Sequence, residues 1–110
     1  MAVSKIIVTD MIMTGNLFEE EGFDLEQSGD NLAEMKGRVI LDYLEEHYPD
    51  IESYADIAIQ AGKGKPRPLE VLVYSETKEL DREASAALWK ELSQRVDEVI
   101  SSRAWAVRKT

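Results

Sequence analysis

The chain has 110 residues, a formal net charge of −9 and no cysteine. This length suffices for one hydrophobic core without metals or crosslinks, so we expect a single domain over residues 1–110. The composition excludes disulfides and thiol chemistry, the single histidine, His47, excludes a histidine-rich metal site, and the negative charge disfavours nucleic-acid and anionic-lipid partners.

Residues 3–13 are predicted to form a first strand. Ile6, Ile7 and Val8 are successive apolar residues, which is typical of an interior strand covered on both faces. Residues 14–29 contain three glycines and the acidic run Glu19–Glu21, and they predict an irregular, tethered loop, with a lid or partner-docking segment as the alternative.

The next segment is predicted to be a long helix. It begins after a cap at Asp30 or Asn31 and ends before Pro49, because apolar residues recur at helical spacing between them. Residues 54–61 alternate between apolar and polar, as in a half-exposed edge strand. Residues 62–68 are rich in glycine, lysine and proline and predict a hairpin loop.

Residues 67–78 hold the clearest strand of the chain. Its apolar core at residues 69–74 is rich in β-branched and aromatic side chains and predicts a strand in the middle of the sheet. We expect it to pair with the preceding strand, with Ile59 opposite Val71.

A second long helix follows, capped by Asp81, with Leu92 and Val96 in the middle of its apolar stripe. Residues 104–107 alternate again and predict a short final strand. The predicted order is β-α-β-β-α-β. It indicates a ferredoxin-like split βαβ fold, with two helices on one face of a four-stranded antiparallel sheet; a thioredoxin-like sheet is the alternative.

One face of this sheet would be free of helices and half apolar. We expect it to bind a protein partner through seven residues, namely Tyr54, Asp56, Gln60, Glu70, Leu72, Tyr74 and Glu76. Our leading hypothesis is therefore a small, acidic, non-enzymatic interaction or regulatory module without metal or cofactor. We also expect it to form a homodimer through the sheet.

A second hypothesis rests on Asp56 on one hairpin strand and Glu76 and Lys78 on the next. In the expected register the two carboxylates lie diagonally, roughly 7–8 Å apart. This pattern resembles the PD-(D/E)xK nucleases, and the resemblance implies a divalent metal held by the carboxylates and a water positioned by the lysine. It covers only the hairpin, and Ala55 stands where that family has a proline.

The sequence also indicates a compartment. The apolar run near the N-terminus is too short for a signal peptide, and nowhere do eighteen apolar residues follow one another. We therefore expect a cytoplasmic protein that makes no use of a membrane.

Overall fold

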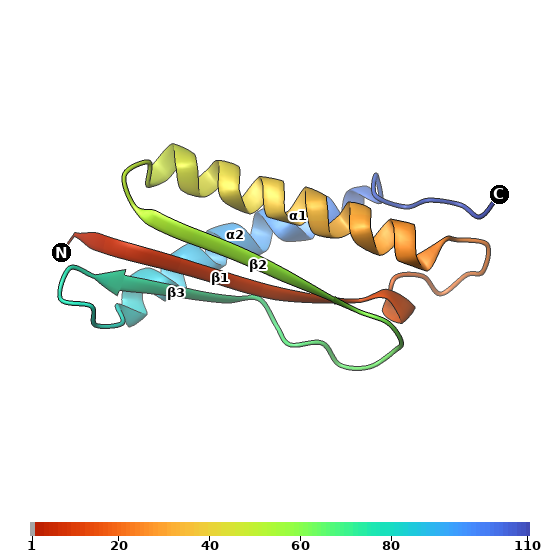
Figure 1. The fold of residues 1–110 in the computed structure, drawn as a ribbon, viewed down its shortest axis with the longest axis horizontal. Coiled ribbons are helices and arrows are strands. Elements are labelled where there is room, and N and C mark those ends of the chain that lie inside the picture. Colours follow the sequence, from red (N-terminus) through yellow and green to blue (C-terminus); the bar gives the residue numbers. More distant parts are fainter. Residues whose placement is uncertain (1) are drawn as a thin grey trace.

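The computed structural model describes residues 2–110 and shows two long helices packed on a small sheet (Figure 1). In chain order the elements are β1 (Val3–Met13), the short 3-10 helix η1 (Thr14–Asn16), α1 (Leu25–His47), β2 (Glu52–Gln60), β3 (Glu70–Ser75) and α2 (Arg82–Ser102). The molecule is long and narrow, with extents of 51 × 25 × 18 Å.

The sheet is mixed, in the order β2-β1-β3. β1 pairs with β2 in parallel from Lys5 to Met13, and with β3 antiparallel from Val3 to Thr9. A parallel neighbour requires a crossover connection, which α1 provides by returning the chain to the start of β1. As predicted, β1 lies inside the sheet and β2 is an edge strand.

The expected ferredoxin-like fold is wrong. That topology leaves a space for another strand between the two strands of the first βαβ unit, whereas β2 here pairs directly with β1. The described residues form a three-stranded mixed sheet rather than a four-stranded antiparallel one. The thioredoxin-like alternative also fails, because a single strand, not a hairpin, lies between β2 and α2.

The predicted final strand at residues 104–107 is absent because the chain folds back on the end of α2. Arg103 has a left-handed backbone (φ 52°) and ends the helix. Trp105 then turns inward, and its indole N–H donates to the carbonyl oxygens of Val99 and Ile100 at 3.1 and 3.3 Å. This side chain is buried, so the alternation in the sequence reflects a packed turn.

The strand expected in the middle of the sheet, β3, lies at its edge. The expected pairing of Ile59 with Val71 is also wrong, because Val71 faces Val8 and Ile59 faces Ile12 on opposite sides of β1. The apolar run of β3 predicts two covered faces. The burial of its side chains in fact alternates: Val71 and Val73 pack under the helices, while Leu72 is only partly covered on the other face.

The connection between β2 and β3 crosses the end of β1. The Gly15 N–H donates to the Gly62 carbonyl at 2.9 Å. The Asn16 side-chain amide donates to the Gly64 carbonyl and accepts the Gly64 N–H. A Cβ atom at Gly15 would lie 2.5 Å from the Gly62 oxygen, so this close approach requires glycine.

The helix starts show one correct and one incorrect prediction. Asp81 caps α2 as expected, accepting the Ala84 N–H at 2.9 Å. α1, however, begins at Leu25 and is capped by Asp24, rather than by Asp30 or Asn31. Its first turns contain buried Ser28, whose hydroxyl accepts the Val107 N–H, and such polar positions hide the helical pattern in the sequence.

Both helices pack on the same face of the sheet, where two clusters of buried side chains form the core. The larger cluster lies toward the start of β1 and contains Ile6, Val8, Ile40, Leu44, Val71, Val73, Leu88, Leu92 and Val96. The smaller contains Ile12, Leu32 and Trp105. Figure 1 shows α2 behind the strands, so the face of the sheet toward the viewer is uncovered.

Candidate functional site

The uncovered face of the sheet is the candidate interaction surface. Because side chains alternate along a strand, the residues between the buried positions of β1 point to this face. The strand register then arranges the face in rows across β2, β1 and β3. These rows are Glu52–Lys5–Tyr74, Tyr54–Ile7–Leu72 and Asp56–Thr9–Glu70, followed by the two-strand rows Ala58–Met11 and Gln60–Met13.

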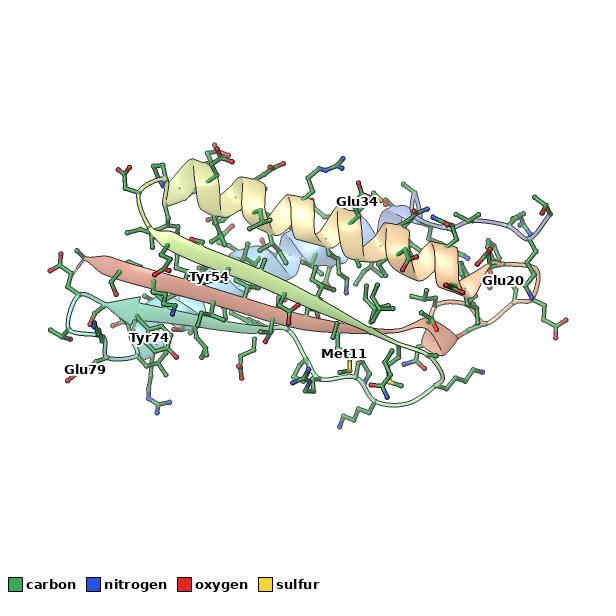
Figure 2. The ribbon with its side chains drawn as sticks, viewed as in Figure 1. Met11, Glu20, Glu34, Tyr54, Tyr74 and Glu79 are labelled. Carbon is green, nitrogen blue, oxygen red and sulfur yellow. The ribbon has the colours of Figure 1, made fainter. Side chains whose placement is uncertain are left out.

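The second row is the apolar centre of the uncovered face. Ile7 and Leu72 are partly covered by their neighbours, whereas Tyr54 is 49% exposed. Met11 and Tyr74 extend the apolar surface along the strands, and Figure 2 shows Met11, Tyr54 and Tyr74 on the side of the sheet that faces the viewer. Aromatic and methionine side chains are enriched in protein interfaces, so this row suits contact with another protein.

Two side chains of the first row, Glu52 and Lys5, contact Tyr54 of the second row. The Tyr54 hydroxyl donates to the Glu52 carboxylate, and this hydrogen bond holds the pKa of the phenol above its usual value of 10.0. The Lys5 ammonium lies 5.4 Å from the centroid of the Tyr54 ring. Tyr54 is therefore held between a carboxylate and a cation, which lowers the entropy lost when a partner contacts it.

Two shallow hollows flank the apolar row. One, of about 470 Å³, is lined by Ser4, Lys5, Ile7, Glu52, Tyr74 and Lys78. The other, of about 270 Å³, is lined by Thr9, Asp10, Arg67, Pro68 and Glu70. Each contains acidic and basic side chains together, which suits polar contacts around an apolar centre.

The structure places six of the seven residues expected to bind a partner on one face of the sheet, spread along its length: Tyr54, Asp56, Gln60, Glu70, Leu72 and Tyr74. They lie on β2 and β3 with β1 between them, instead of on adjacent strands. The seventh, Glu76, lies beyond β3 in an exposed turn, where its N–H donates to the Ala2 carbonyl. The side-chain period predicted that these six residues share a face, although the predicted strand order was wrong. Binding by these residues stays a prediction.

The structure does not bring together the three residues of the nuclease-like pattern. Asp56 lies opposite Thr9, whereas Glu76 contacts Ala2 at the other end of β1. Lys78 sits in the turn after β3 with a left-handed backbone (φ 67°). In the part of the chain that the structure describes, no group of three or more carboxylate or histidine side chains is placed to hold a metal ion.

The sequence interpretation missed a buried ion pair between β1 and α1. The Lys36 ammonium lies 3.0 Å from the Asp10 carboxylate, and the side chains are 7% and 8% exposed. Asp10 also accepts the Met11 N–H at 2.8 Å, where β3 no longer reaches β1. The signal was present in the sequence. Asp10 follows the helix-facing positions Ile6 and Val8, and Lys36 stands midway between Leu32 and Ile40 in the apolar stripe.

The loop between β1 and α1 is tethered, as predicted, and its contacts are aromatic and ionic. Phe18 and Phe23 stack with ring centroids 3.9 Å apart. The Arg103 guanidinium lies over both rings and 2.6 Å from the Glu20 carboxylate. This hydrogen bond lowers the pKa of Glu20 from its usual value. The acidic run is thus partly neutralised by the basic end of the chain.

Comparisons with protein-family models, with curated proteins and with solved structures found no match for this chain. Within residues 2–110, neither long helix is apolar over enough of its length to cross a membrane. Function must therefore be inferred from the surface itself.

Proposed function

We propose that the protein is a small non-enzymatic interaction module whose contact surface is the uncovered face of the sheet. The observation that carries this proposal is the apolar row Tyr54–Ile7–Leu72 at the centre of a face that no helix covers. Removing apolar surface from water is favourable by about 25 cal/mol per Å². A partner that covers this row would therefore supply the cover that the two helices provide on the other face.

We propose that the partner is a second copy of the chain, so that the module is a homodimer. If two faces stack about a twofold axis that crosses the strands at Ile7, the first row of one copy lies over the third row of the other. Lys5 would then lie above Thr9, between the carboxylates of Asp56 and Glu70. The same arrangement places Glu52 above Asp56, but it separates the two Lys5 side chains, which would face each other if equal rows met.

Net charge opposes this association. Each copy carries −9, and the carboxylates of Glu52, Asp56 and Glu70 belong to the stacking surface. Exposed charges are screened beyond about 8 Å at physiological ionic strength. Association should therefore strengthen as salt rises, because the long-range repulsion is screened while the apolar contact is retained.

Sedimentation equilibrium at low and at physiological salt tests the homodimer. We expect a larger dimer fraction at the higher salt. Tyr74→Glu should give a monomer in both salts, because it places a charge beside the apolar row. Ile100→Glu is the matched control, since it changes an exposed apolar side chain on α2. A wild-type protein that stays monomeric at high concentration in both salts would refute self-association through this face.

A further inference from the structure

The two edges of the sheet differ in how their backbone groups are used. At the outer edge of β3, the Val73 N–H donates to the Ser85 hydroxyl at 2.9 Å and the Val73 carbonyl accepts the Asp81 N–H at 2.8 Å. The Ser75 N–H donates to the Glu79 carbonyl at 2.9 Å, and the Trp89 indole donates to the Leu69 carbonyl at 2.9 Å. α2 and the turn that precedes it therefore occupy the outward backbone groups at Val73 and Ser75, whereas those of Val71 have no partner among residues 2–110.

The outer edge of β2 is open. Backbone groups of successive residues point to opposite sides of a strand, and the parallel register directs those of Glu52, Tyr54, Asp56, Ala58 and Gln60 toward β1. The intervening residues Ser53, Ala55, Ile57 and Ile59 direct theirs outward. Among residues 2–110, no group donates to or accepts from these outward N–H and C=O groups.

β2 also lacks several of the features that usually protect an edge strand. It has nine residues, no proline and no basic residue, and its register with β1 runs without a bulge. An unpaired edge of this length is a template for an added strand, as in the binding of extended peptides to sheet edges.

The surroundings of the edge indicate what such a strand would contain. On the helix side, Leu41 and Ile59 are 46% and 44% exposed. A hollow of about 410 Å³ there is lined by Leu41, Leu44, Glu45, Tyr48, Ile51 and Ser53. Every second residue of an added strand would point to this side. Apolar side chains at those positions would cover Leu41 and Ile59.

On the uncovered face, the side chains nearest the edge are Glu52, Tyr54 and Asp56. β2 offers no positive charge to balance the two carboxylates, and the only basic residue across from them on β1 is Lys5, which lies over Tyr54. Residues of an added strand that point to this face would meet carboxylates, so lysine or arginine fits there.

We infer that the open edge of β2 binds an extended segment of a protein partner, with basic residues alternating with apolar ones, as a fourth strand of the sheet. A second copy of the chain fits this edge less well, because its own β2 would bring Glu52 and Asp56 against the same carboxylates. The added strand would pair with the backbone edge of β2, and its basic residues would share Glu52 and Asp56 with the stacked face.

Amide hydrogen exchange with a nine-residue peptide that alternates lysine and valine tests the inference. The peptide should slow exchange at Ser53, Ala55, Ile57 and Ile59, and leave the amides of Tyr54, Asp56 and Ala58 unchanged, because β1 already protects them. The same peptide with every backbone nitrogen methylated has no N–H left to complete the ladder in either strand direction and should give no protection. Protection of none of the four outward amides, or equal protection by the methylated peptide, would overturn the inference.

Charge reversal provides the second arm of the test. Glu52→Lys combined with Asp56→Lys should weaken binding of the lysine peptide by roughly tenfold, since an exposed ion pair contributes up to about a factor of five. The same variant should gain binding to a glutamate–valine peptide. If the lysine peptide binds both proteins equally, the proposed charge recognition is wrong.

Further outcomes distinguish peptide binding at the edge of β2 from self-association and from peptide binding at the uncovered face. If the outward amides of β2 become protected without peptide as protein concentration rises, the edge is covered by a second copy and the inference fails. If Tyr74→Glu abolishes dimerisation but leaves the peptide-induced protection unchanged, the edge site is supported independently of the face. Protection by the peptide that is lost in Tyr74→Glu would place the peptide on the face and overturn the edge site.

Discussion

At the scale of single residues, the buried Asp10–Lys36 pair joins α1 to β1 near the boundary between the two core clusters. Lys36 stands one turn from Leu32 of the smaller cluster and one turn from Ile40 of the larger. Replacing one partner of a buried pair leaves an uncompensated charge away from water, which costs more than the pair itself contributes. The pair is therefore a polar link between α1 and β1 inside the core.

Lys36→Met should destabilise the fold by about 3–5 kcal/mol, because the Asp10 carboxylate would stay buried without its cation. Asp10→Asn combined with Lys36→Met should recover much of this loss, since the amide oxygen can still accept the Met11 N–H and no charge is buried. Urea denaturation at neutral pH measures both free energies of unfolding.

Arg38→Met is the matched control for this experiment. It breaks the exposed pair between Arg38 and Glu34 on the same helix, which should cost less than about 1 kcal/mol. A Lys36→Met protein as stable as Arg38→Met would contradict the assigned role of the buried pair.

At the scale of elements, α2 both supplies core side chains and occupies part of one edge of the sheet. Leu88, Leu92 and Val96 pack in the larger cluster. One turn earlier, the Ser85 hydroxyl accepts the Val73 N–H. This double role explains why β3 is stable at an edge although it has only six residues. It also leaves β2 as the edge on which an added strand can pair.

Leu92→Ala should lower the free energy of unfolding by about 2–5 kcal/mol, because this side chain is fully buried and its removal leaves a cavity. The neighbouring change Glu91→Ala removes an exposed side chain and should be nearly neutral. Urea midpoints of the two variants give the comparison. If the two variants had equal urea midpoints, Leu92 would not be packed in the core.

At the scale of the whole molecule, the fold is stretched along its strands. Its radius of gyration is 15.3 Å, against roughly 13 Å for a compact domain of this length. The smaller cluster lies at the end where Trp105 packs on the loop between β1 and α1 through Phe18. The C-terminal segment is bound there to the start of α1, where the Asp24 N–H donates to the Val107 carbonyl at 2.8 Å. This end depends on one large side chain.

Trp105→Ala should therefore open that end before the rest. Native-state hydrogen exchange should speed up most at Ile12 and in the first turns of α1, while amides near Leu44 and Val73 keep most of their protection. Trp89→Ala is the control of equal size: it removes a partly exposed tryptophan that bonds the Leu69 carbonyl, and it should not speed exchange at Ile12. A uniform loss of protection over the chain in Trp105→Ala would contradict a separate, less stable end.

Local patterns in the sequence predicted the three strands and the two long helices, but they also predicted a strand at residues 104–107 that is absent. The apolar stripe and its capping residue predicted α2, and the run at Ile6–Val8 predicted the interior strand. The side-chain period assigned Tyr54, Asp56, Leu72 and Tyr74 to one face, because alternation along a strand does not depend on which strand lies beside it. The sequence therefore predicted which of these residues share a face, but not the order of the strands that form it.

Strand order, the buried ion pair and the open edge were decided only by the tertiary structure. The β-branched run of β3 fits an edge as well as a centre, since Ser85 and the turn at Asp81 satisfy its outer backbone groups at Val73 from another element. Residues 104–107 alternate like a strand, yet Trp105 caps α2. Lys36 meets Asp10 only when α1 lies across β1. Each outcome depends on contacts between residues far apart in the chain, which a local pattern does not encode.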